Sequence, residues 1–401
     1  MESSEPRITY ADRLDSISPF RVMELMERAQ YWEARGRSVV HFEVGEPDFN
    51  TAAPIIEAGK RALDEGYTKY TNAVGATELR EAIAAYYATL GASVDADRIV
   101  VTAGASGGLL LLAALLMNPG DELLITDPGY PCNEVFVRLA CGEPRRIALD
   151  SDSGYQLSAD LVRAHWEKST RALLVASPAN PTGAVMDAKH LRDLVETTHG
   201  LGGSFVLDEI YQGLTYAKAP GYSTGLAVHG DIVVLNSFSK YFGMTGWRLG
   251  WLVVPEAFVD GLTRLAQNLF ISPSSIAQRA ALAAFSEEAM CIHEERRQRF
   301  DARRGLLLEG LRELGFRVPV EPAGAFYIYA DISGLGVPES GNSYAFCRRL
   351  IDEYQVAVTP GNDFGDVQAR RFVRFAYTTD EASIREGLVR IGRACDQWAR
   401  G

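Results

Sequence analysis

Cysteine is scarce in this chain. Its 401 residues include five cysteines, and no two of them have the spacing of a redox motif or of a metal site. The sequence therefore predicts no metal centre. Scattered cysteines are typical of proteins from a reducing compartment, so we expect a cytoplasmic protein.

Long hydrophobic runs and an excess of positive charge are also missing. The longest apolar run, Leu109–Met117, is far shorter than the ~20 residues of a membrane helix. The segment Met1–Pro6 is acidic and has no apolar core, unlike a signal peptide. The 40 basic and 52 acidic residues give a formal net charge of −12, which argues against a broad nucleic-acid surface. We expect neither a membrane nor a nucleic acid as a partner.

Short apolar runs alternate with amphipathic stretches through the middle of the chain. The apolar runs predict six strands, at residues 99–101, 122–125, 146–149, 172–175, 204–207 and 232–235. Helices are predicted between them, at residues 106–117, 133–141, 157–167 and 188–199. Such a pattern indicates a mostly parallel sheet that is covered on both faces. Ligands of such sheets bind beyond the carboxyl ends of the strands.

The two ends of the chain have a different pattern. After an arm that reaches about Tyr10, we predict a helix over 18–34 with Pro19 in its first turn. A strand over 39–44 and helices over 54–65 and 77–90 follow. Beyond Pro273 one helical stretch is predicted to run to about Leu314. A smaller α+β lobe is then predicted from strands at 326–329, 356–358 and 372–375 and helices at 343–354 and 381–398.

The segment Ser237–Arg248 is the one most suited to chemistry. Lys240 follows an apolar strand, where a lysine is costly unless it is paired or reacts through a desolvated amine. Hydroxyl groups and Arg248 suit a phosphate, so the segment predicts a pocket for a phosphorylated aldehyde, with pyridoxal phosphate (PLP) as the obvious candidate. One alternative is a lysine that reaches the solvent. Another is the S-x-x-K motif of penicillin-binding enzymes, but its S-D-N and K-T-G companions are absent.

A second motif, Gly104–Gly108, joins a strand to a helix. Free backbone amides at a helix start bind phosphate, which makes Ser106 a candidate phosphate donor. The same letters fit G-x-S-x-G, the nucleophile motif of α/β-hydrolases. A hydrolase would need a later acid and then a histidine, and the last histidine, His293, has no loop that obviously presents it. We therefore favour the phosphate site and keep the hydrolase as an alternative.

Four more candidates lie within or just after strands. Asp208 needs a cationic partner if it is buried, and a protonated pyridine nitrogen is one; a metal-binding acid is the alternative. Tyr130 is suited to stacking on a flat ring, and Asn180, placed before a proline, can aim its amide into a cleft. Both also suit ordinary turns. Arg374 lies in an apolar strand, where it pairs either with a substrate carboxylate or with an acidic side chain.

Together these segments resemble the class I/II aminotransferases, the aspartate-aminotransferase-like branch of the fold type I PLP enzymes. The resemblance extends from Gly45-Glu46-Pro47-Asp48 to Arg374, and Ser237–Gly250 fits the family's lysine-site signature. It implies an α/β fold, with a mostly parallel seven-stranded-type sheet in a large domain and a smaller α+β domain. The implied bounds are 1–49 for an arm and part of the small domain, 50–285 for the PLP-binding domain and 286–401 for the small C-terminal domain.

The resemblance also implies residue roles. Lys240 forms the internal aldimine and moves the proton, and Asp208 pairs with the pyridine nitrogen. The other implied cofactor contacts are Asn180 and Tyr211 at the ring hydroxyl, Tyr130 on the ring, and Ala105, Ser106, Ser237 and Arg248 at the phosphate. Tyr70 reaches the phosphate of the neighbouring subunit, which implies a homodimer. The implied substrate contacts are Arg374, the Gly45 backbone and Asn180.

The implied reaction is a ping-pong transfer of an amino group between an L-amino acid and a 2-oxo acid. A β-lyase on the same fold is the alternative and would release ammonia or a thiol without an oxo acid. A PLP-binding regulator without enzymatic activity is a third possibility. Alanine, aspartate, aromatic and aliphatic donors all stay open. We expect Asn268 and the stretch Ile271–Ser275 to shape the pocket for the substrate side chain.

Overall fold

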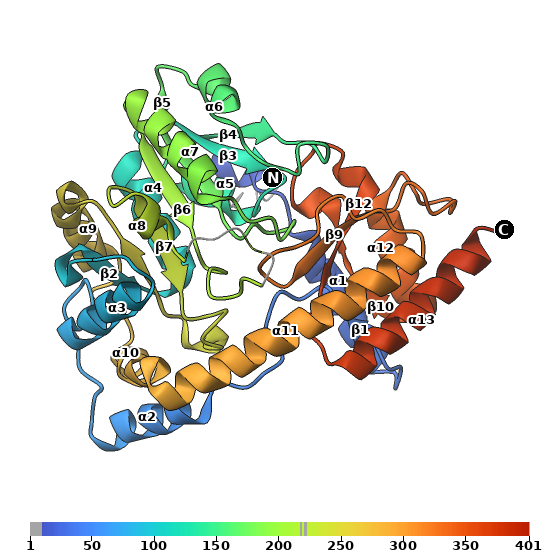
Figure 1. The fold of residues 1–401 in the computed structure, drawn as a ribbon, viewed down its shortest axis with the longest axis horizontal. Helices are drawn as coiled ribbons and strands as arrows, with labels where there is room; N and C mark the ends of the chain where they lie inside the picture. Colours follow the sequence, from blue (N-terminus) through green and yellow to red (C-terminus); the bar gives the residue numbers. More distant parts are fainter. Residues whose placement is uncertain (1–9, 217–218, 220–222, 401) are drawn as a thin grey trace, which may run out of the picture.

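The computed structural model describes residues 10–216, 219 and 223–400 (Figure 1). The predicted arm, up to about Tyr10, therefore lies outside the described residues except for Tyr10 itself. A large sheet with its helices fills one side of the molecule, and a smaller lobe lies on the other side. Within the described residues, no helix has both the length and the apolar character needed to span a membrane.

The large sheet has seven strands in the order β2-β8-β7-β6-β5-β3-β4. All neighbouring strands are parallel except β8, which is antiparallel to both β2 and β7. The mostly parallel sheet is thus confirmed. The sequence patterns predicted six of its strands and missed β8. The seven strands are β2 (Ile99–Thr102), β3 (Glu122–Asp127), β4 (Glu143–Ala148), β5 (Thr170–Ala176), β6 (Ser204–Asp208), β7 (Val233–Ser237) and β8 (Gly250–Val253).

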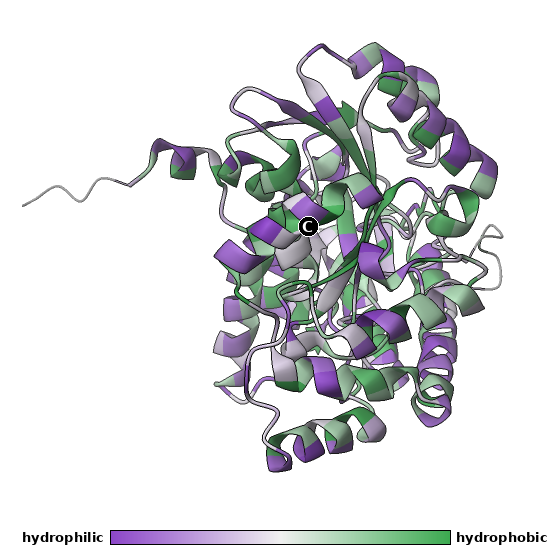
Figure 2. Ribbon diagram, turned by 90° about the vertical axis from the view of Figure 1, so that its left-hand side faces the viewer, coloured by the Kyte–Doolittle hydropathy of each residue, from purple (hydrophilic) through white to green (hydrophobic). Residues whose placement is uncertain are grey.

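Helices cover both faces of this sheet (Figure 1). Neighbouring residues of β5 belong to different hydrophobic clusters, since Leu173 packs in one and Leu174 in another. Because both faces are buried, the strands are mostly apolar, except the edge strand β4, which carries Arg145 and Arg146. Figure 2 shows much of the interior in green and the surface helices largely in purple. The helices are α2 (Ala53–Asp64), α3 (Thr77–Thr89), α4 (Gly104–Leu116), α5 (Cys132–Leu139), α6 (Ala159–His165), α7 (Ala188–Gly200), α8 (Gly225–Val228), α9 (Glu256–Leu269) and α10 (Ser275–Leu282).

The smaller lobe combines the two ends of the chain. β1 (Val40–His41) pairs in parallel with β10 (Val356–Ala357), so the predicted strand 39–44 is much shorter than expected. An antiparallel sheet has the order β11-β12-β9, and α1 packs beside these strands in Figure 1. The domain bounds themselves stay a prediction. The other elements are α1 (Arg21–Glu33), α12 (Ser343–Tyr354), α13 (Glu381–Trp398), β9 (Tyr327–Asp331), β11 (Thr359–Pro360) and β12 (Phe372–Ala376).

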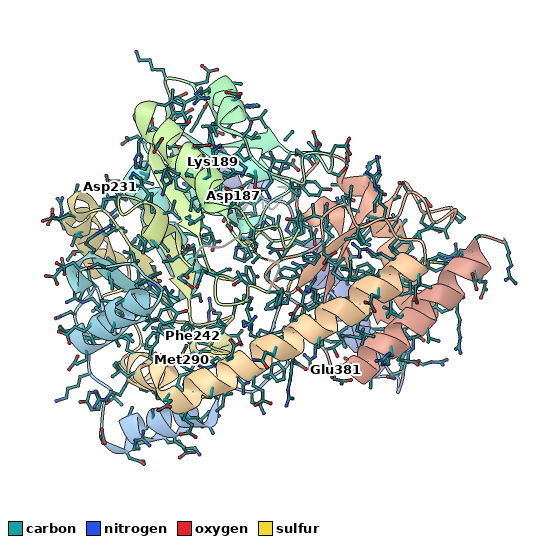
Figure 3. All side chains as sticks on the ribbon, viewed as in Figure 1. Asp187, Lys189, Asp231, Phe242, Met290 and Glu381 are labelled. Carbon is teal, nitrogen blue, oxygen red and sulfur yellow. The ribbon has the colours of Figure 1, made fainter. Side chains whose placement is uncertain are left out.

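The helical stretch after Pro273 is broken, which corrects the prediction of one continuous helix. A 3₁₀ turn (Ala283–Phe285) follows α10, and α11 (Glu287–Glu313) then begins at Ser286. The Ser286 hydroxyl caps α11 by accepting from Ala289 N at 3.2 Å, which allows the chain to change direction. Figure 3 shows Phe242 and Met290 together near the start of α11, and both pack in one cluster. From there α11 runs across to the smaller lobe (Figure 1).

The first helix begins later than predicted. α1 starts at Arg21 and its N-cap is Phe20, so Pro19 lies outside the first turn. The carboxylate of Asp363 accepts from the backbone N–H groups of Arg21 at 3.1 Å and of Val22 at 2.8 Å. These are two of the N–H groups that a helix start leaves without partners. A residue 342 positions away thus fixes where α1 begins, which no local pattern can reveal.

Candidate active site

Lys240 follows β7 and is largely enclosed. Its Nζ donates a hydrogen bond to Gly45 O at 2.6 Å. Burial lowers the pKa of Lys240 to about 8, and the nearby cations Arg374 and Arg248 act in the same direction. A lysine amine with this pKa is partly neutral near neutral pH, as a nucleophile or a general base must be.

Seven of the predicted site residues surround one cleft of about 380 Å³. They come from segments that follow strands, as expected for a parallel sheet. Ligand pockets of proteins have volumes in this range. Glu46, Thr245 and Gly246 also line the cleft. The seven predicted residues in its lining are Ala105, Ser106, Tyr130, Asp208, Ser237, Lys240 and Arg248.

One end of this cleft has the chemistry of a phosphate site. α4 begins there, with free backbone N–H groups at its start. Gly104 has a φ of +70°, and a Cβ on it would come within 2.7 Å of Arg248 Nη2, so only glycine lets the guanidinium approach the helix start. The Ser237 hydroxyl lies at 2.9 Å from that of Ser239. Backbone amides, hydroxyl groups and a guanidinium are the donor set that binds a phosphate group.

At the other end Asp208 is buried at the end of β6. Its Oδ1 accepts from Ile210 N at 3.0 Å, yet burial raises the pKa of Asp208 to about 6. A carboxylate in such a place is stabilised as an anion only by a cation. The ring nitrogen of a bound pyridinium fits this requirement, so the residues present suit PLP at both ends of the cleft. Among the described residues, no cluster of histidine, cysteine, aspartate or glutamate side chains could hold a metal ion.

Arg374 of β12 is buried next to the cleft. Its Nη1 donates to Asn180 Oδ1 at 3.1 Å, and its Nη2 donates to Glu43 O at 2.7 Å. It forms no ion pair with any described residue within 4.0 Å, and its Nε lacks a hydrogen-bond partner among them. Among the described residues, Arg374 therefore does not form the structural ion pair that was the alternative to binding a substrate carboxylate. A buried guanidinium without an anion is suited to an incoming carboxylate.

Tyr327 lies next to both Tyr211 and Gly45, and the sequence patterns did not identify it as a site residue. The hydroxyl groups of Tyr211 and Tyr327 lie 2.8 Å apart, and a Cβ on Gly45 would come within 2.0 Å of the Tyr327 hydroxyl. The Arg374 guanidinium lies 4.2 Å from the Tyr327 ring centroid. A tyrosine inside an apolar strand is read as core, and only the arrangement of distant segments reveals its position beside Lys240.

Tyr70, Ile271 and Asn268 do not line the cleft of the single chain, and neither do the predicted residues Gly45, Asn180, Tyr211 and Arg374. Tyr70 is 80% exposed, and Ile271 is 55% exposed. Asn268 is exposed on α9, where its side chain donates to Arg264 O. The first was predicted to serve a neighbouring subunit, and the others to shape the side-chain pocket.

The hydrolase alternative finds no support in the described residues. Ser106 is exposed at the start of α4 and has no hydrogen bond to a histidine. His293 is buried in α11 against the rings of Tyr241 and Phe242, each with its centroid 5.4 Å away. Burial lowers the pKa of His293 to about 4. This histidine packs as a neutral aromatic ring on a different element and is not placed to act as a base for Ser106.

Comparison with known proteins gives matches over nearly the whole chain. Residues 37–391 match the family described as aminotransferase class I and II. The chain is 36% identical to the (5-formylfuran-3-yl)methyl phosphate transaminase of Methanocaldococcus jannaschii over 94% of this chain and 97% of that protein. It is also 36% identical to the valine–pyruvate aminotransferase of Mycobacterium tuberculosis, over 94% and 96%. The structure of Thermus thermophilus aspartate aminotransferase with maleate superposes with a TM-score of 0.89, at 33% identity over 96% and 99%.

Proposed function

The chain belongs to the aminotransferase class I and II family and is an aminotransferase, and we propose that it uses PLP bound in the Lys240 cleft. The family generally uses this cofactor. The observation that supports the proposal is the position of Lys240, with a pKa lowered to about 8, between a phosphate-suited helix start and the buried Asp208. We propose that the substrates are an amino acid and a 2-oxo acid.

The residues that would hold the cofactor follow from the two ends of the cleft. Ala105, Ser106, Ser237 and Arg248 are the phosphate ligands, and Asp208 is the partner of the ring nitrogen. Asn180 and Tyr211 are placed for the ring hydroxyl, and Tyr130 for the ring face. When bound, PLP supplies an aldehyde that takes up the amino group of the substrate and a protonated ring that withdraws electrons from the bound substrate.

The chain's own residues bind the substrate and move the proton. Arg374 binds the α-carboxylate, because the hydrogen bonds to Asn180 and Glu43 O fix its guanidinium and leave it without an anion. The neutral Nζ of Lys240 would take the proton from the substrate Cα and pass it to the carbon of the cofactor's aldehyde group, and the second half of the reaction would run this transfer in reverse. Gly45 O, which accepts from Nζ at 2.6 Å, keeps the amine at the site between these steps.

The cofactor proposal is tested by the visible spectrum of the purified protein, beside the variant Lys240→Ala. We expect a yellow protein whose absorbance changes with an amino acid and returns with a 2-oxo acid, and a variant that lacks both changes. Ping-pong kinetics should follow. Release of ammonia or a thiol without an oxo acid would indicate the β-lyase instead. A protein that stays colourless with added PLP would contradict the proposal.

We further propose a homodimer in which Tyr70 serves the neighbouring cleft. Tyr70 is 80% exposed, and Leu63, Leu269 and Ile271 are at least half exposed. Leu63 lies in α2 and Ile271 just ahead of α10, and the segment after α2 is joined to α10 by a hydrogen bond from Ser275 to Tyr67 O at 3.1 Å. Exposed apolar groups gathered in this way mark protein interfaces. The predicted domain bounds and a cytoplasmic location also stay proposals.

Mixing two inactive variants tests the dimer. Lys240→Ala and Tyr70→Ala are unfolded together and refolded as a mixture, with each variant refolded alone as the control. If Tyr70 acts across the interface, a mixed dimer has one cleft with both residues intact, and activity returns. If Tyr70 acts in its own chain, or if the protein is a monomer, the mixture stays as inactive as its parts.

A further inference from the structure

A second chamber lies beside the Lys240 cleft. Its volume is about 370 Å³, and Tyr130 lines both the chamber and the cleft. One wall is the segment Ser16–Phe20 ahead of α1, and another is α5. None of the functions assigned above uses this chamber.

Phe364 connects the chamber to Arg374. Its ring lines the chamber, and the Arg374 guanidinium lies 4.7 Å from its centroid. An amino acid held by its carboxylate at Arg374, with its Cα beside Lys240, thus has two boundaries of the chamber next to it, Tyr130 and Phe364. The chamber is therefore a candidate space for the side chain of that amino acid.

The inward-facing groups of the wall are apolar. Residues 10–21 are all exposed except Ile17 and Phe20, which are half-buried and line the chamber. Val135 of α5 lines it from the other side. Together with Tyr130 and Phe364, they form the apolar part of a lining that also contains six charged residues, and against this part a side chain displaces only water.

The charged residues of the lining already have partners. Arg146 Nη1 lies 2.7 Å from Asp366 Oδ2, and Arg146 also pairs with Glu134. Arg138 lies 3.9 Å from Glu134 and 3.8 Å from Glu143, although its Nε has no hydrogen-bond partner among the described residues. The acidic groups around these two arginines outnumber them. A carboxylate that entered would lose hydration and meet cations that are already neutralised.

The third cation of the lining points elsewhere. The Arg21 guanidinium lies 5.2 Å from the ring centroid of Tyr344 on α12, and its backbone N–H is bound to Asp363. The chamber therefore has no guanidinium that is buried and without an anion, as the guanidinium of Arg374 is.

We propose that this chamber receives the side chain of the amino donor and selects uncharged apolar side chains, aliphatic or aromatic, over acidic ones. This inference rests on the function proposed above. It narrows the set of donors that the sequence left open, and it places selectivity in Ile17, Phe20, Val135 and Phe364.

Single-turnover measurements with the holoenzyme test the proposal without a choice of acceptor. The protein is mixed with L-leucine, L-phenylalanine, L-alanine, L-aspartate or L-glutamate, and the rate of the change in cofactor absorbance is followed against donor concentration. We expect apparent second-order rate constants for leucine and phenylalanine that exceed those for aspartate and glutamate at least about tenfold, because a desolvated carboxylate without a partner is strongly rejected. A preference for aspartate or glutamate would overturn the proposal. No reaction with any donor would instead contradict the proposed function.

A matched pair of variants tests the location. Ile17→Lys adds a cation to the chamber lining, whereas Met23→Lys adds the same charge to a position on α1 that is 51% exposed and outside the lining. We expect Ile17→Lys to raise the ratio of aspartate to leucine rate constants about tenfold or more, and Met23→Lys to leave the ratio as in the wild type. Equal ratios in both variants would show that the donor side chain does not enter this chamber.

Discussion

The hydroxyl groups of Tyr211 and Tyr327 lie 2.8 Å apart beneath the Lys240 cleft. Tyr211 stands three residues after Asp208, and Tyr327 begins β9 in the smaller lobe. The ring of Tyr327 also carries the Arg374 guanidinium at 4.2 Å. Tyr327 thus fixes two groups. One is the Tyr211 hydroxyl, which is proposed to bond the cofactor, and the other is the Arg374 guanidinium, which is proposed to bind the substrate carboxylate.

Replacing Tyr327 by phenylalanine should separate these two tasks. The ring under Arg374 stays, but the buried Tyr211 hydroxyl loses its partner, which costs about 1–3 kcal/mol. We expect a lower melting temperature of the cofactor-free protein and a weaker affinity for PLP, with little change in the KM of the amino acid. Tyr329→Phe is the control, since its ring stacks on Phe372 instead. An unchanged PLP dissociation constant in Tyr327→Phe would show that this hydrogen bond does not position Tyr211.

Arg374→Lys should act on substrate binding. Lysine keeps the charge but loses the planar fork, and with it the bonds to Asn180 and Glu43 O. One lost hydrogen bond to a charged group is about 1.5–3 kcal/mol, so we expect the KM values of amino acid and oxo acid to rise about 10- to 100-fold. Arg371→Lys is a control, because Arg371 pairs with Asp331 away from the cleft. A KM that rises for only one of the two substrates would contradict a shared carboxylate site.

Lys240→Met should reveal the energetic cost of the buried amine. The pKa of Lys240 falls from 10.5 to about 8 on folding, so between these pH values the unfolded chain binds a proton that the folded chain does not. The wild type therefore gains stability as pH rises from 8 to 10.5, by about 3 kcal/mol. Unfolding of the cofactor-free proteins by urea at several pH values measures this. We expect the difference in unfolding free energy between variant and wild type to narrow in that window; a constant difference would show that Lys240 is not desolvated.

Asp208→Asn should stabilise the cofactor-free protein and impair the enzyme. Burial raises the pKa of Asp208 to about 6 from 3.8, so the wild type loses stability as pH rises through that interval, by about 3 kcal/mol. At pH 7 the neutral variant avoids this loss. We expect a higher melting temperature without cofactor, but weaker PLP binding and a kcat at least about 100-fold lower, because the ring nitrogen loses its anionic partner. A variant with full activity would remove Asp208 from the proposed site.

Much of the fold could be predicted from local patterns. The bounds predicted for α12 and α13 match the structure, because their apolar residues recur with helical spacing. β8 was missed because Gly250–Val253 is short and begins with glycine, which is depleted in strands. That glycine is needed, since a Cβ on it would come within 2.9 Å of Ala105 N, and this contact is not local in sequence.

The candidate site likewise contains residues whose positions could be predicted from local patterns and residues whose positions could not. Asp208 and Lys240 could be predicted to meet, because polar residues after parallel strands gather at one edge of the sheet. Tyr327 and the carbonyl group of Glu43 could not, because a buried tyrosine and a backbone oxygen carry no signal in the sequence. They reach the cleft only through the pairing of β1 with β10 and of β12 with β9.

Asp363→Ala tests how the distant start of α1 supports the site. The carboxylate accepts from two N–H groups of that helix, at 2.8 and 3.1 Å, and its loss should cost about 1–2 kcal/mol, as for other helix caps. Because the segment Ser16–Phe20 enters α1 at this point and forms a wall of the second chamber, we also expect a higher KM for leucine and little change for alanine. Asp363→Asn keeps one acceptor oxygen but turns its NH2 group toward the other N–H, so it should recover only part of both losses. Equal increases in KM for leucine and alanine would mean that Asp363 supports the whole fold rather than this wall.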